Sequence, residues 1–181
     1  MIRKTGAPAH CFSMRCSPFG PVAAVWSAAH AGPRVVRIFL SSPGRPPAKS
    51  VAKFFPGAQA RTSPKIEALL ERIGNFLEGK SVTFGLGEIR LDLCSPFQRK
   101  VLRAQCGVRR GRLSTYRSIA DRLGNRGASR AVGAALAANP FPILIPCHRT
   151  IRSDGALGGY QGGRKMKTAL LKMEGNDILT S

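Results

Sequence analysis

The sequence predicts a mixed α/β (α+β) fold in two parts, a small α/β domain over residues 1–92 and a mainly helical domain over residues 93–181. Two observations predict this division. Short runs of β-branched and aromatic residues occur before residue 41, whereas apolar residues recur at helical spacing from residue 64 onward. Lys and Arg outnumber Asp and Glu by 16 to 4 in residues 94–181, but only by 13 to 5 before them. The basic character is therefore denser in the helical part.

The first part contains two predicted strands and one predicted helix. A strand pair is indicated by the apolar runs VAAVW (22–26) and VVRIFL (35–40). The following stretch SSPGRPPAKS (41–50) is typical of a turn-rich loop. A helix then begins at Ser63-Pro64, with Ser63 as the N-cap and Pro64 at the first helical position. Its apolar positions recur up to Leu77, and Gly79 follows its end.

The second part contains a predicted helix-turn-helix. One helix begins at Ser95-Pro96, and a basic loop follows. The next two helices cover residues 115–124 and 128–138, and the second ends before Pro140. Two helices joined by so short a turn resemble a DNA-binding helix-turn-helix. The second helix is rich in Ala and Gly. Such small side chains allow a helix either to approach a groove or another backbone closely, or to pack tightly in the core.

The composition narrows the class of protein. The chain has 181 residues, of which 43% are hydrophobic, so it can build a packed core. Its net charge of +20 favours a polyanionic partner, nucleic acid ahead of an anionic membrane, although a GC-rich coding sequence can also inflate the arginine content. No apolar run approaches the roughly 18 to 20 residues of a membrane span, and the N-terminus lacks the apolar stretch of a signal peptide. The five scattered cysteines predict free thiols in a reducing, intracellular compartment.

The segment NPFPILIPCHRT (139–150) carries the clearest chemistry. Its apolar run ends in Cys147 and His148, and a neighbouring base or cation can lower the pKa of a thiol. Because adjacent side chains rarely face each other, we expect a water between this pair. Glu174 falls in the last turn of the final helix (164–175), where the helix dipole disfavours its charge. We therefore expect Glu174 to have a specific partner, and His148 is the obvious one.

Several motifs in register resemble one family. They are SPFQRKVL (95–102), TYRSIADRLG (115–124), SRAVGAALAANP (129–140), NPFPILIPCHR (139–149), SDGALGGYQGG (153–163) and LLKMEG (170–175). In order and spacing they resemble the O6-alkylguanine-DNA alkyltransferases. The resemblance is dense over residues 93–175 and thinner at SPFGPVAAVW (17–26). It implies a ribonuclease-H-like N-terminal scaffold domain, and DNA repair by one irreversible transfer of the alkyl group from guanine to the protein's own cysteine.

The resemblance also implies the catalytic residues. Cys147 is the nucleophile, His148 its base through water, and Glu174 the residue that orients His148. Asn139 links the recognition helix to the active-site segment. Two further residues are expected near the reacting oxygen of guanine, namely Tyr116, which also turns the target phosphate, and Lys167.

The resemblance further implies a base pocket and a DNA-binding surface. The base pocket is expected to contain Tyr160, Gln161 and Thr150. Family members usually have Val at the position of Thr150 and a smaller residue at that of Gln161, so these departures affect pocket size. The minor-groove surface is expected to contain Arg130, which fills the space left by the flipped base, together with Ala131, Gly133, Ala134, Tyr116 and Arg149.

The expected partner is double-stranded DNA containing O6-alkylguanine, with O4-alkylthymine as an open alternative. We expect a monomer in the cytoplasm (nucleoid) or nucleus, without membrane association, organic cofactor or metal. The spacing of His10, Cys11, Cys16 and His30 fits no standard zinc pattern. Three alternatives are weaker. A non-transferring relative would lack the Cys of PCHR, a self-alkylating regulator would need a further domain, and a Cys-His hydrolase would show an oxyanion-hole motif.

Overall fold

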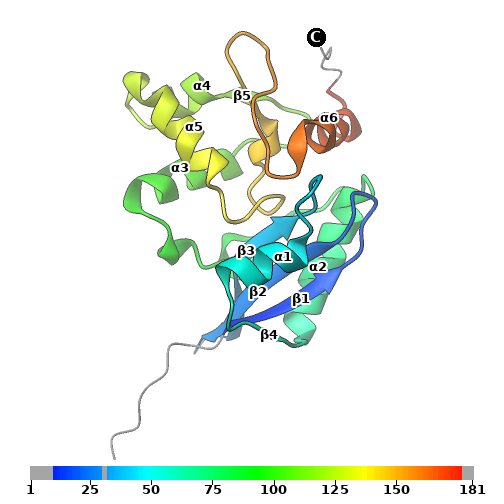
Figure 1. Cartoon of the computed structure of the whole chain (residues 1–181). Helices are drawn as coiled ribbons and strands as arrows, with labels where there is room; N and C mark the ends of the chain where they lie inside the picture. The colour runs from blue at the N-terminus through cyan, green and yellow to red at the C-terminus, as the bar shows by residue number, and fades with distance from the viewer. Residues whose placement is uncertain (1–9, 30–31, 177–181) are drawn as a thin grey trace, which may run out of the picture.

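The structure, a computed structural model, describes residues 10–29 and 32–176 and has a mixed α/β architecture (Figure 1). Its first part is a four-stranded sheet in the order β3-β2-β1-β4. Strands β1 and β2 and strands β2 and β3 pair antiparallel, whereas β1 and β4 pair parallel. The elements of this part are β1 (His10–Arg15), β2 (Val22–Ala29), β3 (Gly32–Leu40), α1 (Pro47–Phe54), β4 (Gln59–Ala60) and α2 (Pro64–Leu77).

The sheet is covered on both faces, which explains why β2 is apolar over residues 22–26. Alternate residues of a strand point to opposite faces. Val22, Ala24 and Trp26 therefore join the main core with α2, whereas Ala23 and Val25 pack with Val51 of α1 in a smaller cluster. The predicted strand pair is confirmed, and β1 and β4 extend it.

The predicted loop over residues 41–50 is partly wrong, because α1 begins inside it at Pro47. Proline is compatible with the first turn of a helix, so the prolines here precede a helix instead of excluding one. The predicted helix over residues 64–77 is confirmed in its bounds. Ser63 occupies the N-cap position, but its side chain makes no capping hydrogen bond.

The second part is mainly helical and contains the predicted helix pair. Helix α4 (Tyr116–Arg122) is capped by Thr115, whose Oγ1 accepts from the Ser118 amide at 3.0 Å. A short 3-10 turn (Arg126–Ala128) joins α4 to α5. The helices of this part are α3 (Pro96–Cys106), α4 (Tyr116–Arg122), α5 (Ser129–Ala137) and α6 (Gly163–Met173).

One hydrophobic core runs through both parts. It combines residues of β2 and α2 with residues of the C-terminal helices, among them Leu102, Ile119 and Leu170. The backbone also joins the parts directly, because the Ile38 amide of β3 donates to the Pro140 carbonyl at 2.8 Å. The first part thereby supports the segment that follows α5. Among the described residues, no helix is both long and apolar enough to cross a membrane.

Candidate active site around a half-buried cysteine

The segment between α5 and Cys147 is a compact buried turn. Phe141, Ile143 and Ile145 are almost completely buried. Ile143 has a φ of +73°, which is rare for a β-branched residue and costs backbone energy. The surrounding core holds this conformation in place. The turn delivers Cys147 to the start of a one-turn 3-10 helix (Cys147–Arg149).

Asn139 ties this turn to the cysteine. Its side-chain amide donates to the Ile145 carbonyl and to Cys147 Sγ, both at 3.2 Å. Its side-chain oxygen accepts from the Phe141 amide at 2.9 Å. Asn139 therefore satisfies two backbone groups of the turn and positions the sulfur. The resemblance names Asn139 and Cys147 as catalytic residues but does not predict this contact between them.

A buried ion cluster lies behind the cysteine. His148 Nε2 and Glu174 Oε1 are 3.2 Å apart, and His148 is completely buried. Arg149 donates to both carboxylate oxygens of Glu174 at 2.8 Å, and to the Val108 carbonyl at 2.7 Å. Glu174 is thus held by two partners, of which only His148 was predicted. Because the guanidinium of Arg149 is buried and fully engaged, the structure contradicts its predicted DNA contact.

The electrostatics of this cluster define the resting protonation states. Burial raises the pKa of the Cys147 thiol, although the hydrogen bond from Asn139 and the charge of Lys167 oppose this shift. Burial lowers the pKa of His148, against the effect of Glu174. Burial also opposes ionisation of Glu174, but hydrogen bonds from His148 and Arg149 outweigh it and lower the pKa to about 2. At neutral pH the cluster therefore contains a thiol, a neutral imidazole and a carboxylate.

These states fix the tautomer of His148. The ionised Glu174 only accepts hydrogen bonds, so Nε2 carries the proton of the imidazole. Nδ1 is then a free acceptor, and it is buried without a partner among the described residues. No direct hydrogen bond joins it to Cys147 in the described part of the chain. An intervening water, as expected from the sequence, would complete the path from the thiol to this base.

Lys167 lies behind the cavity wall instead of at its surface. Its side chain is completely buried, and Nζ donates to the Thr150 carbonyl at 2.6 Å and to the Leu157 carbonyl. Burial lowers its pKa to about 8, and the nearby Cys147 opposes this shift. Lys167 therefore does not reach the guanine oxygen as predicted. Instead it holds two backbone carbonyls behind the cavity, and its charge favours the thiolate form of Cys147.

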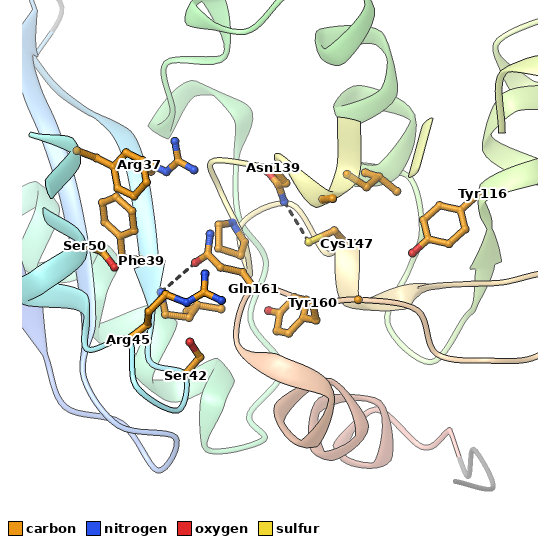
Figure 2. Close-up of a pocket in the computed structure, with 16 residues that line it drawn as sticks. Arg37, Phe39, Ser42, Arg45, Ser50, Tyr116, Asn139, Cys147, Tyr160 and Gln161 are labelled. Atoms are coloured by element: carbon orange, nitrogen blue, oxygen red, sulfur yellow. Dashed lines mark hydrogen bonds between the residues drawn. The ribbon is translucent and has the colours of Figure 1, made fainter. Parts of the chain in front are cut away.

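A cavity of about 380 Å³ opens in front of Cys147 (Figure 2). The second part contributes Tyr116, Asn139, Tyr160 and Gln161 to its lining. The hydroxyl of Tyr116 packs so closely against Gly158 that a Cβ there would lie 2.7 Å from it. The first part contributes a wall that the sequence did not predict, which includes Arg37, Phe39, Arg45 and Phe54.

Gln161 and Thr150, the two residues that depart from the family pattern, lie in different places relative to the cavity. Gln161 lines the cavity, and its Oε1 accepts from the Leu40 amide at 3.0 Å, which joins the two parts of the chain. Thr150 does not line it, so its predicted role in the base pocket is wrong. Its hydroxyl is buried and donates to Gln105 Oε1 at 2.6 Å, and Gln105 in turn donates to the Pro146 carbonyl at 2.7 Å. Sequence reasoning missed Gln105, although a Gln on the same helical face as Val101 and Leu102 is an available signal.

The outer face of α5 carries small side chains, as the Ala- and Gly-rich sequence of this helix indicates. Arg130, Ala131 and Ala134 are exposed, and small side chains there leave the backbone accessible. Gly133 is half-buried and faces the ring of Tyr116, with 3.8 Å between a hypothetical Cβ and Tyr116 Cδ1. Gly133 therefore makes room for Tyr116, and its place in the DNA surface stays a prediction.

Comparison with known proteins agrees with this geometry. The family model "6-O-methylguanine DNA methyltransferase, DNA binding domain" matches residues 96–176. The inducible methylated-DNA–protein-cysteine methyltransferase of Bacillus subtilis is 40% identical over 124 residues, which cover 67% of this chain and 68% of that protein. The chain belongs to the methylated-DNA–protein-cysteine methyltransferase family.

Other members of the family agree in sequence and fold. The Methanothermobacter thermautotrophicus protein is 48% identical over 110 residues, and the match spans 61% of each chain. The structure of Mycobacterium tuberculosis OGT in complex with DNA matches with a TM-score of 0.69 at 29% identity, covering 91% of this chain and 92% of that one. The family's mixed α/β fold therefore extends over both parts of the chain.

Proposed function

We propose that this protein repairs DNA by transferring the alkyl group of O6-alkylguanine to Cys147, once per molecule. The observation that carries the proposal is the placement of Cys147 Sγ, at a cavity and 3.2 Å from Asn139, with the His148–Glu174 pair behind it. The names of the relatives and the DNA complex of the M. tuberculosis protein support it.

The chemistry follows from the groups at the cavity. Cys147 Sγ attacks the alkyl carbon while the bond from that carbon to O6 breaks, and the electron pair leaves with guanine. The thiol proton passes to His148 Nδ1 through water, and the resulting imidazolium is stabilised by Glu174. Burial raises the pKa of Tyr116, so its hydroxyl stays protonated and can donate to the departing guanine. The product is a thioether that water does not cleave at neutral pH, so each molecule reacts once.

The DNA must expose the lesion before this reaction. A guanine in a duplex is stacked, and flipping it out costs a few kcal/mol. The exposed face of α5 carries small residues beside Arg130, whose side chain can occupy the vacated space in the stack. The net charge of +20 supports contacts with phosphates.

The same proposal includes the organisation of the chain. Residues 1–92 form a ribonuclease-H-like scaffold domain, and residues 93–181 form the domain that binds DNA and accepts the alkyl group. The protein acts as a monomer on DNA in the nucleoid or nucleus, with O4-alkylthymine as a second candidate lesion. The reaction as written requires neither a metal nor an organic cofactor.

Mass spectrometry of the protein after incubation with a duplex containing O6-methylguanine tests the proposal. We expect one methyl group per molecule, located on the peptide that contains Cys147. A Cys147→Ser variant should stay unmodified. A Cys106→Ser variant should react like the wild type, because burial raises the pKa of the Cys106 thiol to about 11. Removal of more lesions than there are protein molecules, or an unmodified Cys147 after repair, would contradict the proposal.

Arg130 provides a separate prediction about base flipping. An Arg130→Ala variant should lose about tenfold or more in the rate of transfer from duplex DNA, because nothing would offset part of the unstacking cost. Its loss with free O6-benzylguanine, which needs no flipping, should be much smaller. The matched control is Arg126→Ala, which removes an exposed charge from the neighbouring turn. Equal losses of Arg130→Ala on both substrates would count against this role.

A further inference from the structure

The cavity in front of Cys147 continues beyond the groups that the proposed transfer uses. On the side away from Tyr116 it reaches strand β3, the turn that follows β3, and helix α1 (Figure 2). Two arginines, Arg37 and Arg45, lie in this wall. No acidic residue lies among the described residues that line the cavity. The far side of the cavity is therefore positively charged, which favours an anion.

Arg37 has no anionic partner among the described residues. Its guanidinium carbon lies 5.3 Å from the ring centroid of Phe39 and 5.4 Å from that of Phe54. These rings are themselves stacked, with 5.9 Å between their centroids. Nε of Arg37 is buried without a hydrogen-bond partner, and burial lowers the pKa of this residue. The aromatic rings thus hold a half-buried cation in place while one of its donors stays unsatisfied.

Arg45 is presented by a tight turn. Its amide donates to the Ser42 carbonyl at 2.9 Å, and Pro43-Gly44 occupies the centre of the turn, with φ of +70° at Gly44. Proline followed by glycine is the pattern of a type II turn, which restricts the backbone at this point. In Figure 2 the side chain of Arg45 extends from this turn toward Gln161. Neither Arg37 nor Arg45 forms an ion pair within the described part of the chain.

The position of the two arginines indicates which anion would reach them. The cavity that they line is continuous with Cys147, where the alkyl carbon is transferred. Pro142 and Tyr160 line the same cavity, so a group bonded to that carbon and pointing away from guanine stays within it. Its volume of about 380 Å³ is within the range of roughly 300–1,000 Å³ for small-ligand pockets. An extended substituent on O6 can therefore approach the arginines.

We propose that Arg37 and Arg45 form an anion subsite that selects O6 substituents ending in a carboxylate. This inference rests on the proposed function and specifies a class of its substrates. The bond from Cys147 Sγ to the substituent's carbon forms as the bond from that carbon to O6 breaks. Guanine leaves with the electron pair and takes up one proton. The carboxylate stays attached through Cys147 and remains beside the arginines.

Two free bases test the subsite without any phosphate, namely O6-(4-carboxybenzyl)guanine and its neutral analogue O6-(4-carbamoylbenzyl)guanine. The wild type should react with the carboxylate at least about tenfold faster than with the amide, the effect of one charge-assisted hydrogen bond. In the Arg37→Gln/Arg45→Gln variant the ratio of the two rates should fall to about one. Lys49→Gln, which removes a charge from α1 without lining the cavity, should keep the wild-type ratio. A wild-type ratio near one, or an unchanged ratio in the double variant, would overturn the subsite.

Binding of the same two bases to a Cys147→Ala protein separates this inference from the proposed function. A preference for the carboxylate in calorimetry that disappears in the arginine double variant supports the subsite, even if the wild type transfers no group. Transfer of both bases to wild-type Cys147 without any preference would leave the proposed function standing and refute the subsite.

Discussion

A Glu174→Ala variant is expected to lose about 3–5 kcal/mol of stability and about a hundredfold or more in the rate of alkyl transfer. Glu174 compensates the buried charge of Arg149 and orients His148. Without the carboxylate, Arg149 stays buried without a counter-charge, and the tautomer of His148 is no longer fixed. Urea unfolding measures the first effect, and single-turnover kinetics with an O6-methylguanine duplex measure the second.

Two variants sharpen this test. Glu174→Gln keeps the shape and one acceptor, so we expect an intermediate loss of stability but a similar loss of rate, since a neutral amide does not stabilise an imidazolium. Asp154→Asn breaks the exposed ion pair with Arg152 and should change stability by less than about 1 kcal/mol. If Glu174→Ala were as stable as Asp154→Asn, the ion cluster would not support the fold.

The same carboxylate predicts a dependence of stability on pH. The pKa of Glu174 is about 2 in the folded protein against 4.5 for an unperturbed carboxyl group. The folded state therefore binds this proton less readily, so the stability it contributes is present above pH 4.5 and is lost as the pH falls toward 2. The expected loss is about 3 kcal/mol. The Glu174→Ala variant should lack this contribution, so its free energy of unfolding should fall by about 3 kcal/mol less than that of the wild type between pH 4.5 and pH 2.

Much of the fold follows from local sequence signals. Ser63-Pro64 and Ser95-Pro96 start helices because serine and proline suit the first positions of a helix, and both helices begin there. Strand β1 (His10–Arg15) gave no such signal. Its buried positions include the polar Ser13, whose hydroxyl donates to the Arg61 carbonyl at 2.6 Å. Because Ser13 is polar but buried, the strand does not show the apolar and polar alternation of a half-buried strand. Its hydrogen-bond partner, Arg61, is too distant in the sequence to be recognised.

The candidate site was predictable where one motif contains it. His148 and Glu174 pair as expected, because an acid at the C-terminal end of α6 calls for a specific partner. The directions of Arg149 and Thr150 were not predictable. Successive side chains of a 3-10 turn point to different sides, and only the packing around them decides which side faces the cavity.

The arginine wall of the cavity was also beyond sequence reasoning. Arg37 and Arg45 precede Cys147 by about a hundred residues, and their strand and turn carry no pattern that relates them to it. They reach the cavity only because β3 packs against the segment after α5, as the hydrogen bond from Ile38 to Pro140 shows. Contacts of this kind between distant segments depend on the assembled core.

Replacing Lys167 with methionine is expected to slow alkyl transfer at pH 7 by about ten- to a hundredfold. The buried ammonium lies close enough to Cys147 to oppose the effect of burial on the thiol pKa, and each unit of thiol pKa corresponds to a factor of ten in the thiolate population. A pH profile of transfer from O6-benzylguanine should show the variant's rising limb displaced toward higher pH. Lys172→Met, an exposed substitution on the same helix, should leave the profile unchanged.

The stability of the same variant should depend on pH differently from that of the wild type. The pKa of Lys167 is about 8 when folded and 10.5 when unperturbed, so between these values the unfolded state binds more protons. Wild-type stability should therefore rise with pH in this window, relative to Lys167→Met, by up to about 3 kcal/mol. Parallel stability curves for the two proteins from pH 8 to pH 10.5 would mean that Lys167 titrates normally. In that case burial would not lower the pKa of Lys167 in the folded protein.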